Sequence, residues 1–337
     1  MYAKARLHHI QVKGTTMRVI AIIRKCLECE KELILSAVEK EDKVLFFDNE
    51  EELIKSKDYT NVDILFGEPE YSTVQLMDKL RWIQMSFAGA NKYTSVPDFP
   101  NSITITSASG AYGHVISEYI IAGILALKKS LFEYRRQMQD GKWDRIECDD
   151  TLEGKRVLIL GTGNIGYETA KKLKCFGCYT VGISRTLGKT LEYFDELYTI
   201  DSLDIQLQSA DVVIIALPGT KETEGMFDAK RIEKMKESAI LVNVGRGFIV
   251  NTEDLTKALE QGVISGAVLD VTKPEPLPEN YALRNMDNVV LTPHISGISW
   301  GKNLFTRKRI VEIFCDNLKR DILNETKKNI IDFDKGY

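Results

Sequence analysis

Short runs of aliphatic residues alternate with polar, helix-forming segments along nearly the whole chain. In a first block these runs begin at Arg18, Val44, Val62, Trp82 and Ile103. In a second block the runs begin at Arg156, Tyr179, Val212, Ile240, Gly266 and Val289. The runs show little apolar–polar alternation, which is typical of strands buried on both faces of a parallel sheet. The pattern therefore predicts an α/β protein with two doubly wound parallel sheets and crossover helices.

A long helical pattern from about residue 113 to 139 separates the two blocks, and another runs from about 301 to 324. The part from His114 to Leu127 is too apolar for a solvated surface, so we expect it at a domain junction or a subunit contact. Residues 1–16 carry no acid and precede a second methionine, Met17. We interpret them as a leader or tag and leave them out of the fold prediction.

Composition narrows the class of protein. The chain has 337 residues, enough for two domains, with 44% hydrophobic and 28% charged residues, as in globular proteins. A net charge of −4 does not favour a nucleic-acid partner. The apolar run that starts at Tyr119 ends at Lys128 and Lys129, too early for a membrane span, and residues 1–16 lack the apolar core of a secretory signal. We expect a cytoplasmic protein.

Four of the six cysteines form two CxxC pairs, Cys26/Cys29 and Cys175/Cys178. Such pairs can hold zinc. Here the two pairs are separated by most of the chain, and the second spans a helix end and the next strand. Chance spacing in a reducing cytoplasm therefore explains the pairs better. We therefore predict no metal site.

A glycine-rich turn directly follows the run at Val157–Leu160. It reads Gly161-Thr-Gly163-Asn164-Ile165-Gly166 and leads into a helical segment, as in a dinucleotide-binding βα turn. Gly161 would permit the tight turn, Gly163 the approach of the pyrophosphate, and Gly166 close packing of helix on strand. The helix N-terminus would offer N–H groups to the phosphates.

The end of the next strand distinguishes NAD from NADP. An NAD site usually has an acidic residue there for the ribose hydroxyl, whereas this chain has Ser184-Arg185-Thr186. Arg185 could bind a 2′-phosphate, with hydrogen bonds from the two hydroxyls and help from Lys189. The sequence favours NADP as cofactor and leaves NAD possible, and a solvated Arg185 is the alternative.

Catalytic candidates follow three other strands of the second block. Arg246 follows the run at Ile240, Glu275 the run at Gly266, and His294 the run at Val289. Ligands of open α/β sheets bind outside the carboxyl ends of the strands, so a base, a cation and a carboxylate are expected at one edge. His114 opens a helix and is expected to be structural, while His8 and His9 lie in the leader.

Taken together, these motifs resemble the D-2-hydroxyacid dehydrogenase family. The resemblance rests on GTGNIG, ALPGTKETEG, NVGRG, GAVLDVTKPEPLP and LTPHISG, and more loosely on segments 82–90 and 110–118. It implies that Arg246 binds the substrate carboxylate and polarises the 2-oxo group, that His294 exchanges a proton with that oxygen, and that Glu275 orients His294. Backbone N–H groups of Ala88, Gly89 and Ala90 would bind the substrate. Further cofactor contacts are implied for Leu217, Pro218, Thr223, Val244, Gly245, Asp270 and Gly297.

The resemblance also implies a discontinuous architecture. Residues 17–117 and 299–337 would form a flavodoxin-like substrate domain, and residues 118–298 an inserted Rossmann NAD(P)-binding domain. The site would lie in a cleft with hinges near Glu118 and Gly297, and Phe87, Tyr112 and Trp300 are candidates for its walls. A homodimer that uses the nucleotide domains and the apolar helix is expected.

Some positions depart from the family pattern and bear on the substrate. Asn91 replaces a common Asp, and Thr272-Lys273 replace an aromatic and an acidic residue. The Ser184-Arg185-Thr186 pattern resembles the glyoxylate/hydroxypyruvate reductase branch, so we expect reduction of a small 2-oxoacid by NADPH. The alternatives are an NAD-linked phosphoglycerate or D-lactate dehydrogenase, which predicts an acid at position 184, and a non-catalytic dinucleotide-sensing protein. Formate dehydrogenase shares the fold but pairs its histidine with Gln.

Overall fold

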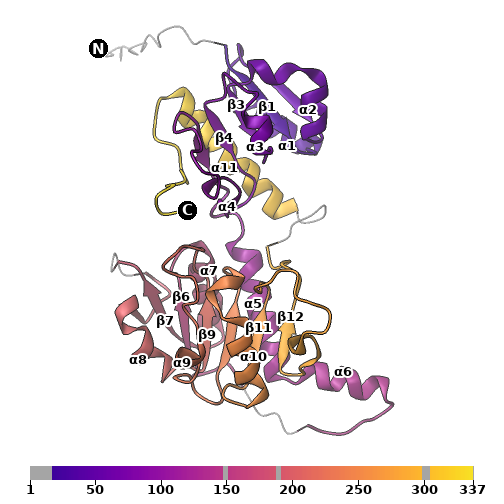
Figure 1. Cartoon of the computed structure of the whole chain (residues 1–337), viewed down its shortest axis with the longest axis vertical. Helices are drawn as coiled ribbons and strands as arrows, with labels where there is room; N and C mark the ends of the chain where they lie inside the picture. The colour runs from indigo at the N-terminus through magenta and orange to yellow at the C-terminus, as the bar shows by residue number, and fades with distance from the viewer. Residues whose placement is uncertain (1–16, 147–150, 187–190, 298–303, 337) are drawn as a thin grey trace, which may run out of the picture. The chain divides into compact units, whose positions relative to one another are not determined.

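The computed structural model describes residues 17–146, 151–186, 191–297 and 304–336. The chain divides into two compact units (Figure 1). Unit 1 comprises the described residues up to Ala108 together with Lys308–Ile331, and unit 2 comprises those of Ser109–Arg307 and those from Asp332 onward. The chain thus leaves unit 1, builds unit 2, and returns. The functional boundaries expected at 117/118 and 298/299 stay predictions.

Unit 1 contains a five-stranded parallel sheet in the order β2-β1-β3-β4-β5. This is the flavodoxin-like order. The strands are β1 (Val19–Ile23), β2 (Lys43–Phe47), β3 (Ile64–Phe66), β4 (Trp82–Gln84) and β5 (Thr104–Thr106). The helices are α1 (Glu28–Leu35), α2 (Glu50–Ser56), α3 (Tyr71–Val74), α4 (Asn91–Thr94) and, from Lys308 onward, α11 (Leu304–Ile322), with a 3₁₀ turn η1 (Asp58–Asn61).

The C-terminal helix α11 covers the sheet of unit 1 (yellow in Figure 1). Phe314 on α11 stacks on Phe66 of β3 with ring centroids 4.4 Å apart, and Trp82 of β4 lies 5.7 Å from it. All three rings are fully buried. Their burial fixes the return of the chain to unit 1, because a large aromatic side chain contributes about 1.5–3 kcal/mol when it leaves water.

Unit 2 contains a seven-stranded parallel sheet in the order β12-β11-β10-β9-β6-β7-β8. Counted from its first strand, this is the Rossmann order with one added strand, and the order reverses between β6 and β9. The strands are β6 (Arg156–Leu160), β7 (Tyr179–Ser184), β8 (Glu196–Thr199), β9 (Val212–Ile215), β10 (Ile240–Asn243), β11 (Gly266–Leu269) and β12 (Val289–Leu291). The helices are α5 (Gly113–Lys128), α6 (Leu131–Gln139), α7 (Asn164–Cys175), α8 (Leu203–Leu207), α9 (Ala229–Ile232) and α10 (Thr252–Glu260), with 3₁₀ turns η2 (Ile200–Ser202), η3 (Gly247–Ile249) and η4 (Ala282–Asn285). The expected fold class is confirmed.

One predicted helix is in fact two. The helical pattern of residues 113–139 divides into α5 and α6 because Ser130 adopts a left-handed conformation with φ of 50°. The apolar α5 packs on α7 and on β11 of its own unit. At Gly123 of α5, an added Cβ would lie 2.5 Å from Val268 of β11, so the helix lies directly on the sheet. Packing within unit 2 therefore accounts for the apolar character of α5.

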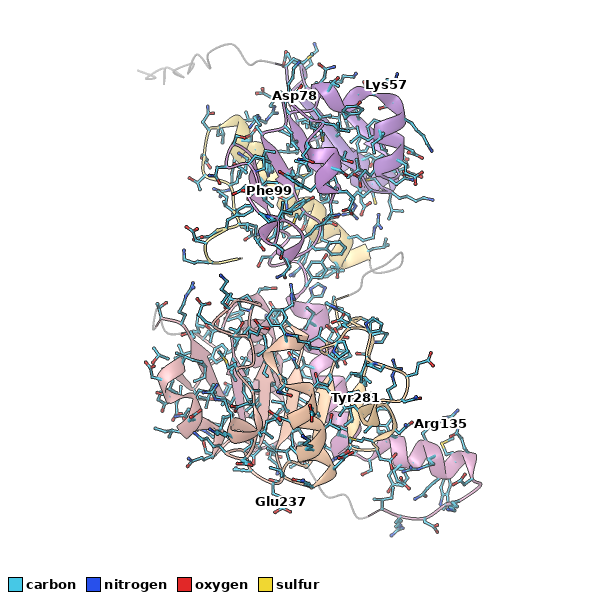
Figure 2. The ribbon with its side chains drawn as sticks, viewed as in Figure 1. Lys57, Asp78, Phe99, Arg135, Glu237 and Tyr281 are labelled. Atoms are coloured by element: carbon cyan, nitrogen blue, oxygen red, sulfur yellow. The ribbon has the colours of Figure 1, made fainter. Side chains whose placement is uncertain are left out.

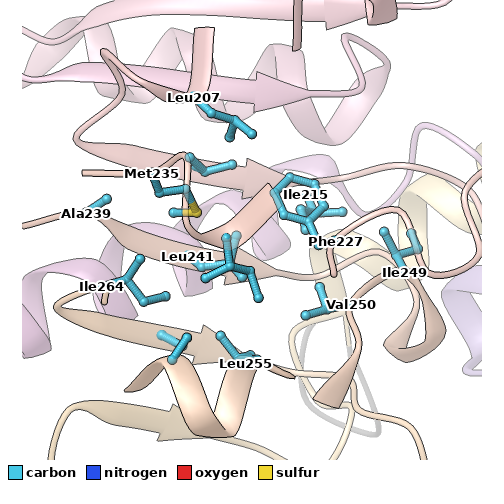
Figure 3. Close-up of a cluster of buried hydrophobic side chains, with 14 of the residues drawn as sticks. Leu207, Ile215, Phe227, Met235, Ala239, Leu241, Ile249, Val250, Leu255 and Ile264 are labelled. Carbon is cyan, nitrogen blue, oxygen red and sulfur yellow. The ribbon is translucent and has the colours of Figure 1, made fainter. Parts of the chain in front are cut away.

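A hydrophobic cluster supports the site loops of unit 2 (Figure 3). Phe227, Ile249 and Val250 belong to this cluster together with Leu241 of β10 and Leu255 of α10. Ile249 and Val250 follow Arg246 closely in sequence and are buried. The loop that carries Arg246 is thus anchored on its C-terminal side by core packing.

None of the helices in the described ranges combines the length and apolar character that a membrane span requires. The same residues contain no cluster of three or more His, Cys, Asp or Glu side chains that could hold a metal ion. Cys178, in the second CxxC pair, is buried. Its thiol donates a hydrogen bond to the Leu152 carbonyl at 3.2 Å, and burial raises the pKa of this thiol to about 11. Cys178 is therefore a packed thiol.

Asp321 of α11 joins three cations of unit 1. It accepts two hydrogen bonds from Arg81, at 2.8 and 2.6 Å, one from Arg18 at 3.1 Å, and contacts Lys327 at 2.8 Å. Its side chain is only 6% exposed. Burial alone would raise the pKa of Asp321, but the hydrogen bonds and charges of Arg81 and Lys327 outweigh it, so the pKa lies well below its usual range.

The variant Asp321→Asn should lower the free energy of unfolding by about 3–5 kcal/mol near neutral pH, because it leaves buried cations without a counter-charge. A carboxyl with a lowered pKa stabilises the fold above its unfolded pKa and loses this contribution as the pH falls toward the folded pKa. Urea unfolding at about pH 7 and about pH 3 should therefore show a smaller loss on acidification for the variant than for wild type. The control Asp316→Asn, in an exposed ion pair on the same helix, should change the free energy by no more than about 1 kcal/mol. Equal effects of the two variants would contradict this account.

Candidate functional site

The glycine turn after β6 lies at the point where the strand order of unit 2 reverses. Gly161 has φ of +97°, and an added Cβ would lie 2.5 Å from the carbonyl oxygen of Ala216, which follows β9. At Gly166 an added Cβ would lie 2.0 Å from the Gly161 oxygen. Both positions exclude a side chain, so α7 starts in close contact with the turn.

Gly163 differs from the other two glycines. An added Cβ would meet no atom within 4 Å, so the surface beside this residue is open. Gly163 is also the N-cap of α7, and no side chain caps the helix there. Among the described residues, the N–H groups of Asn164, Ile165 and Gly166 have no protein acceptor. An open cradle with unused N–H groups at a helix N-terminus fits a pyrophosphate.

The side chain of Asn164 has a structural contact. Its Oδ1 accepts the N–H of Gly113 at 2.9 Å and so ties the start of α5 to α7. Because the side chain is engaged in this bond, only the backbone N–H of Asn164 is available for the predicted contact with the cofactor.

The end of β7 carries no carboxylate. The Ser184 hydroxyl donates to the Thr186 carbonyl at 2.9 Å, while Arg185 and Thr186 are exposed. The charge of Arg185 also acts on Glu222, in the loop after β9. A hydrogen bond from Thr220 lowers the pKa of Glu222 most, and the positive charge of Arg185 adds to this effect. Lys189, a predicted helper, lies outside the described residues.

The loop after β9 contains the predicted residues Leu217, Pro218 and Thr223. The Thr223 hydroxyl donates to the Pro218 carbonyl at 2.9 Å and accepts the Thr220 N–H at 2.9 Å. Thr223 therefore folds this loop back on itself. At Gly219 in the same loop, an added Cβ would lie 2.8 Å from Cγ of Arg246.

Arg246 follows β10, between two glycines in close contact with neighbouring loops. An added Cβ would lie 2.7 Å from the Leu217 oxygen at Gly245 and 2.0 Å from the Thr272 oxygen at Gly247. The Arg246 guanidinium donates to the Gly245 carbonyl at 2.8 Å, and its own carbonyl accepts from Asn243 at 3.1 Å. Val244 is buried beneath this turn.

The positive charge of Arg246 interacts with the negative charge of Glu275. Burial lowers the pKa of Arg246, and the negative charge of Glu275 opposes that shift. An arginine guanidinium stays protonated at neutral pH in proteins, so the lowered pKa leaves the charge in place. The loop after β10 thus presents a fixed cation beside the loop after β11.

His294 and Glu275 form a hydrogen-bonded pair. Nδ1 of His294 lies 2.7 Å from Oε1 of Glu275, and the two side chains are 52% and 42% exposed. His294 has a left-handed backbone with φ of 55°, which is uncommon for a residue with a side chain and concentrates at functional positions. Because Glu275 engages Nδ1, the other ring nitrogen, Nε2, is the one available to a substrate.

Asp270 fixes the loop that carries His294. The buried carboxylate accepts the N–H groups of Ile295 at 2.7 Å and Ser296 at 2.9 Å, and its backbone oxygen accepts the His294 N–H at 2.8 Å. Thr292 donates its hydroxyl proton to Asp270 at 2.7 Å, so the contact at 2.6 Å with Tyr119 has Tyr119 as donor. Burial raises the pKa of Tyr119 to about 12, which keeps that proton in place. Sequence reasoning gave Asp270 only a cofactor contact and missed this role.

The other predicted positions divide between the units. Gly297 packs on α5, where an added Cβ would lie 3.4 Å from Tyr112 and 3.5 Å from Ile116. Tyr112 is buried and Phe87 of unit 1 is 46% exposed, whereas Trp300 lies outside the described residues. Ala88, Gly89 and Ala90 follow β4 of unit 1. The structure thus brings together Arg246, Glu275 and His294 within unit 2, and describes the Ala88–Ala90 loop in unit 1 separately.

His114 has a structural environment. Its ring packs edge-on against Phe305 with centroids 4.8 Å apart, and Nε2 lies 3.4 Å from the Thr306 hydroxyl. His114, Phe305 and Thr306 all belong to unit 2, so these contacts lie within that unit.

A Rossmann-type sheet with an open glycine cradle at its reversal point defines a dinucleotide-binding protein. The sequence matches the D-isomer specific 2-hydroxyacid dehydrogenase NAD-binding domain over residues 121–296. An uncharacterized protein in the proB 3′ region of Corynebacterium melassecola is 36% identical over 71% of this chain and 79% of its own length. The glyoxylate reductase of Thermofilum pendens is 35% identical over 64% of each chain.

Solved structures agree. A D-isomer specific 2-hydroxyacid dehydrogenase family protein from Aeromonas salmonicida is similar with a TM-score of 0.83 and 32% identity, over 94% of this chain and 100% of that one. The chain belongs to the D-isomer specific 2-hydroxyacid dehydrogenase family. It is therefore an NAD(P)-dependent oxidoreductase, and the alternative of a non-catalytic dinucleotide sensor is not favoured.

Proposed function

We propose that this protein uses NADPH to reduce a small 2-oxoacid of the glyoxylate or hydroxypyruvate kind to the D-2-hydroxyacid. The observation that carries the proposal is the 2.7 Å contact between His294 and Glu275 beside the half-buried cation of Arg246. A proton donor and a positive charge are what reduction of a carbonyl beside a carboxylate requires. The Thermofilum pendens relative named glyoxylate reductase supports the substrate class.

Each side chain has one task in this proposal. Arg246 binds the substrate carboxylate and polarises the 2-oxo group. His294 holds a proton at Nε2 and donates it to the oxygen that becomes the hydroxyl. Glu275 holds the ring in position through Nδ1 and stabilises its positive charge. We assign the N–H groups of Ala88, Gly89 and Ala90 to binding of the substrate carboxylate. The bound nicotinamide cofactor supplies the hydride.

The cofactor would be held along the same edge of the unit 2 sheet. Gly161, Gly163, Gly166 and the N–H groups of Asn164 and Ile165 fit the pyrophosphate, and we assign cofactor contacts to Leu217, Pro218, Thr223, Val244, Gly245, Asp270 and Gly297. Arg185 favours the 2′-phosphate of NADPH, because no carboxylate at the end of β7 would hold the ribose of NAD. Ser184 and Thr186 complete this end of the site.

We also propose a cytoplasmic homodimer. Because α5 is packed within unit 2, the apolar surface left for a partner lies on α6, where Leu131, Phe132 and Met138 are 54%, 45% and 64% exposed. An exposed group of apolar side chains along one helix suits an isologous contact.

The variant Arg185→Ala tests the cofactor assignment. It should lower kcat/KM for NADPH at least about tenfold and leave the value for NADH within about threefold, since only the 2′-phosphate loses a charged partner. The measurement is steady-state oxidation of each cofactor with glyoxylate. Lys221→Ala, which removes a nearby cation from the loop after β9, is the control and should have a smaller effect. An unchanged NADPH-to-NADH ratio in Arg185→Ala would sink the NADP assignment.

A further inference from the structure

Two segments of unit 1 meet at the carboxyl edge of its sheet beside the predicted substrate loop. Gly67-Glu68-Pro69 follows β3, and Ser86-Phe87 follows β4 and leads into Ala88–Ala90. The neighbouring strands β3 and β4 are parallel, so their ends share this edge. No role for Glu68 follows from the sequence motifs.

The Glu68 carboxylate binds the start of the substrate loop. Oε1 accepts the Ser86 N–H, and the Ser86 hydroxyl lies 2.9 and 3.1 Å from the two carboxylate oxygens. The backbone N–H of Phe87 also favours the charged carboxylate and acts to lower its pKa. Burial raises the pKa of Glu68, and these donors together with the charge of Arg24 oppose the shift.

The far side of the loop is tied to the same segment. Nζ of Lys92 donates to the Glu68 carbonyl at 2.8 Å and to Glu70 at 2.7 Å, and the Tyr93 hydroxyl donates to the Pro69 carbonyl at 3.0 Å. Tyr93 is fully buried and packs against Phe99, labelled in Figure 2, with centroids 5.5 Å apart. Residues 68–70 therefore hold both ends of the turn that contains Ala88, Gly89 and Ala90.

Arg24 balances the charge behind this loop. Its guanidinium lies 5.2 Å from the centre of the Phe66 ring and 3.7 Å from Glu30, and its charge acts on Glu68. A carboxylate placed behind N–H groups that must bind an anion would repel that anion unless it were compensated. Arg24 supplies the compensation from the end of β1.

We propose that Glu68 is a positioning residue for substrate binding: it orders Ser86 and Phe87 so that the N–H groups of Ala88–Ala90 converge on the substrate carboxylate. This inference rests on the proposed function of the Ala88–Ala90 loop. It assigns the tightness of carboxylate binding to a side chain that does not itself touch the substrate.

The test compares Glu68→Ala and Glu68→Gln in the full-length enzyme. Glu68→Ala should raise KM for glyoxylate and the inhibition constant of oxamate, a carboxylate-bearing analogue, at least about tenfold, because small misplacements of binding groups are costly. The kcat at saturation should change less than about threefold and the Kd of NADPH should not change, since the catalytic trio and the glycine cradle are in unit 2. Glu68→Gln should recover much of the affinity, because its amide oxygen can still accept the Ser86 N–H.

Hydrogen exchange of the Ser86 and Phe87 amides gives a second readout that does not depend on turnover. Both amides should exchange faster in Glu68→Ala than in wild type, while Glu52→Ala, which removes a carboxylate bonded to the Asp48 N–H, should leave exchange and KM unchanged. Faster exchange with an unchanged KM, or an unchanged exchange rate, would overturn the positioning role. If the wild type turned over no 2-oxoacid, the proposed function would fail, and the exchange result would then decide the ordering role of Glu68 separately.

Discussion

His294→Ala should lower kcat for 2-oxoacid reduction by about 10²–10⁴-fold, the usual contribution of a positioned general acid. The reason is geometric. Glu275 binds Nδ1 of the ring at 2.7 Å, and Asp270 holds the backbone of the same loop, so the ring is fixed with Nε2 free. The other histidine of the described ranges, His114, packs against Phe305 and contacts the Thr306 hydroxyl. Single-turnover reduction of glyoxylate by NADPH, followed through loss of the cofactor's absorbance, measures the effect.

The Kd of NADPH should stay within about twofold of wild type in His294→Ala, because the glycine cradle does not depend on the imidazole. The control is His114→Ala, which removes a histidine packed against Phe305 and should leave kcat within about threefold. A kcat that survives His294→Ala would remove His294 from the role of proton donor.

Arg246→Lys should lower kcat/KM by about 10²–10³-fold, as loss of a preorganised charge partner does in other enzymes. Lysine keeps the charge but loses the planar fork that binds a carboxylate through two hydrogen bonds. The close approach of Gly219 to Cγ of Arg246 constrains the side-chain stem, so the shorter ammonium group of lysine would not reach the same point. The measurement is steady-state kinetics with glyoxylate at saturating NADPH.

Arg284→Lys is the matched control for this variant. Arg284 also lies in unit 2 and donates to backbone carbonyls, at 2.9 Å for Pro278, but it is bonded outside the trio. Its kcat/KM should stay within about threefold of wild type. Similar losses in both arginine variants would indicate a general effect on folding and contradict the specific role of Arg246.

Much of the fold could be predicted because its strands are buried on both faces. Runs such as Val212–Ile215 and Ile240–Asn243 contain almost no polar residue, and each is a strand of the unit 2 sheet. β8 was missed because Glu196–Thr199 is a partly buried edge strand with polar residues. The break between α5 and α6 was missed because the residue with the left-handed conformation is Ser130, whereas glycine is the residue that usually signals this conformation in a sequence.

The parts of the candidate site that lie within short motifs could be predicted from the sequence. The contacts that join residues far apart in the chain could not. The structure has the open surface at Gly163 and the close approaches at Gly161 and Gly166 that the glycine spacing predicts, while their cofactor roles stay predictions. The bonds from Asp270 to the His294 loop span more than 20 residues, and those of Glu68 to Ser86 span 18. Nothing in the local sequence marks such partners, because tertiary packing alone brings them together.

The most direct test of the central claim is the fate of deuterium when wild-type enzyme reduces hydroxypyruvate with NADPH deuterated at the reactive C4 position. If this protein reduces 2-oxoacids by hydride transfer with His294 as proton donor, deuterium appears at C2 of glycerate, the product has the D configuration, and His294→Ala produces almost none. Product without deuterium, product of the L configuration, or no reduction of any 2-oxoacid with either cofactor would contradict the account.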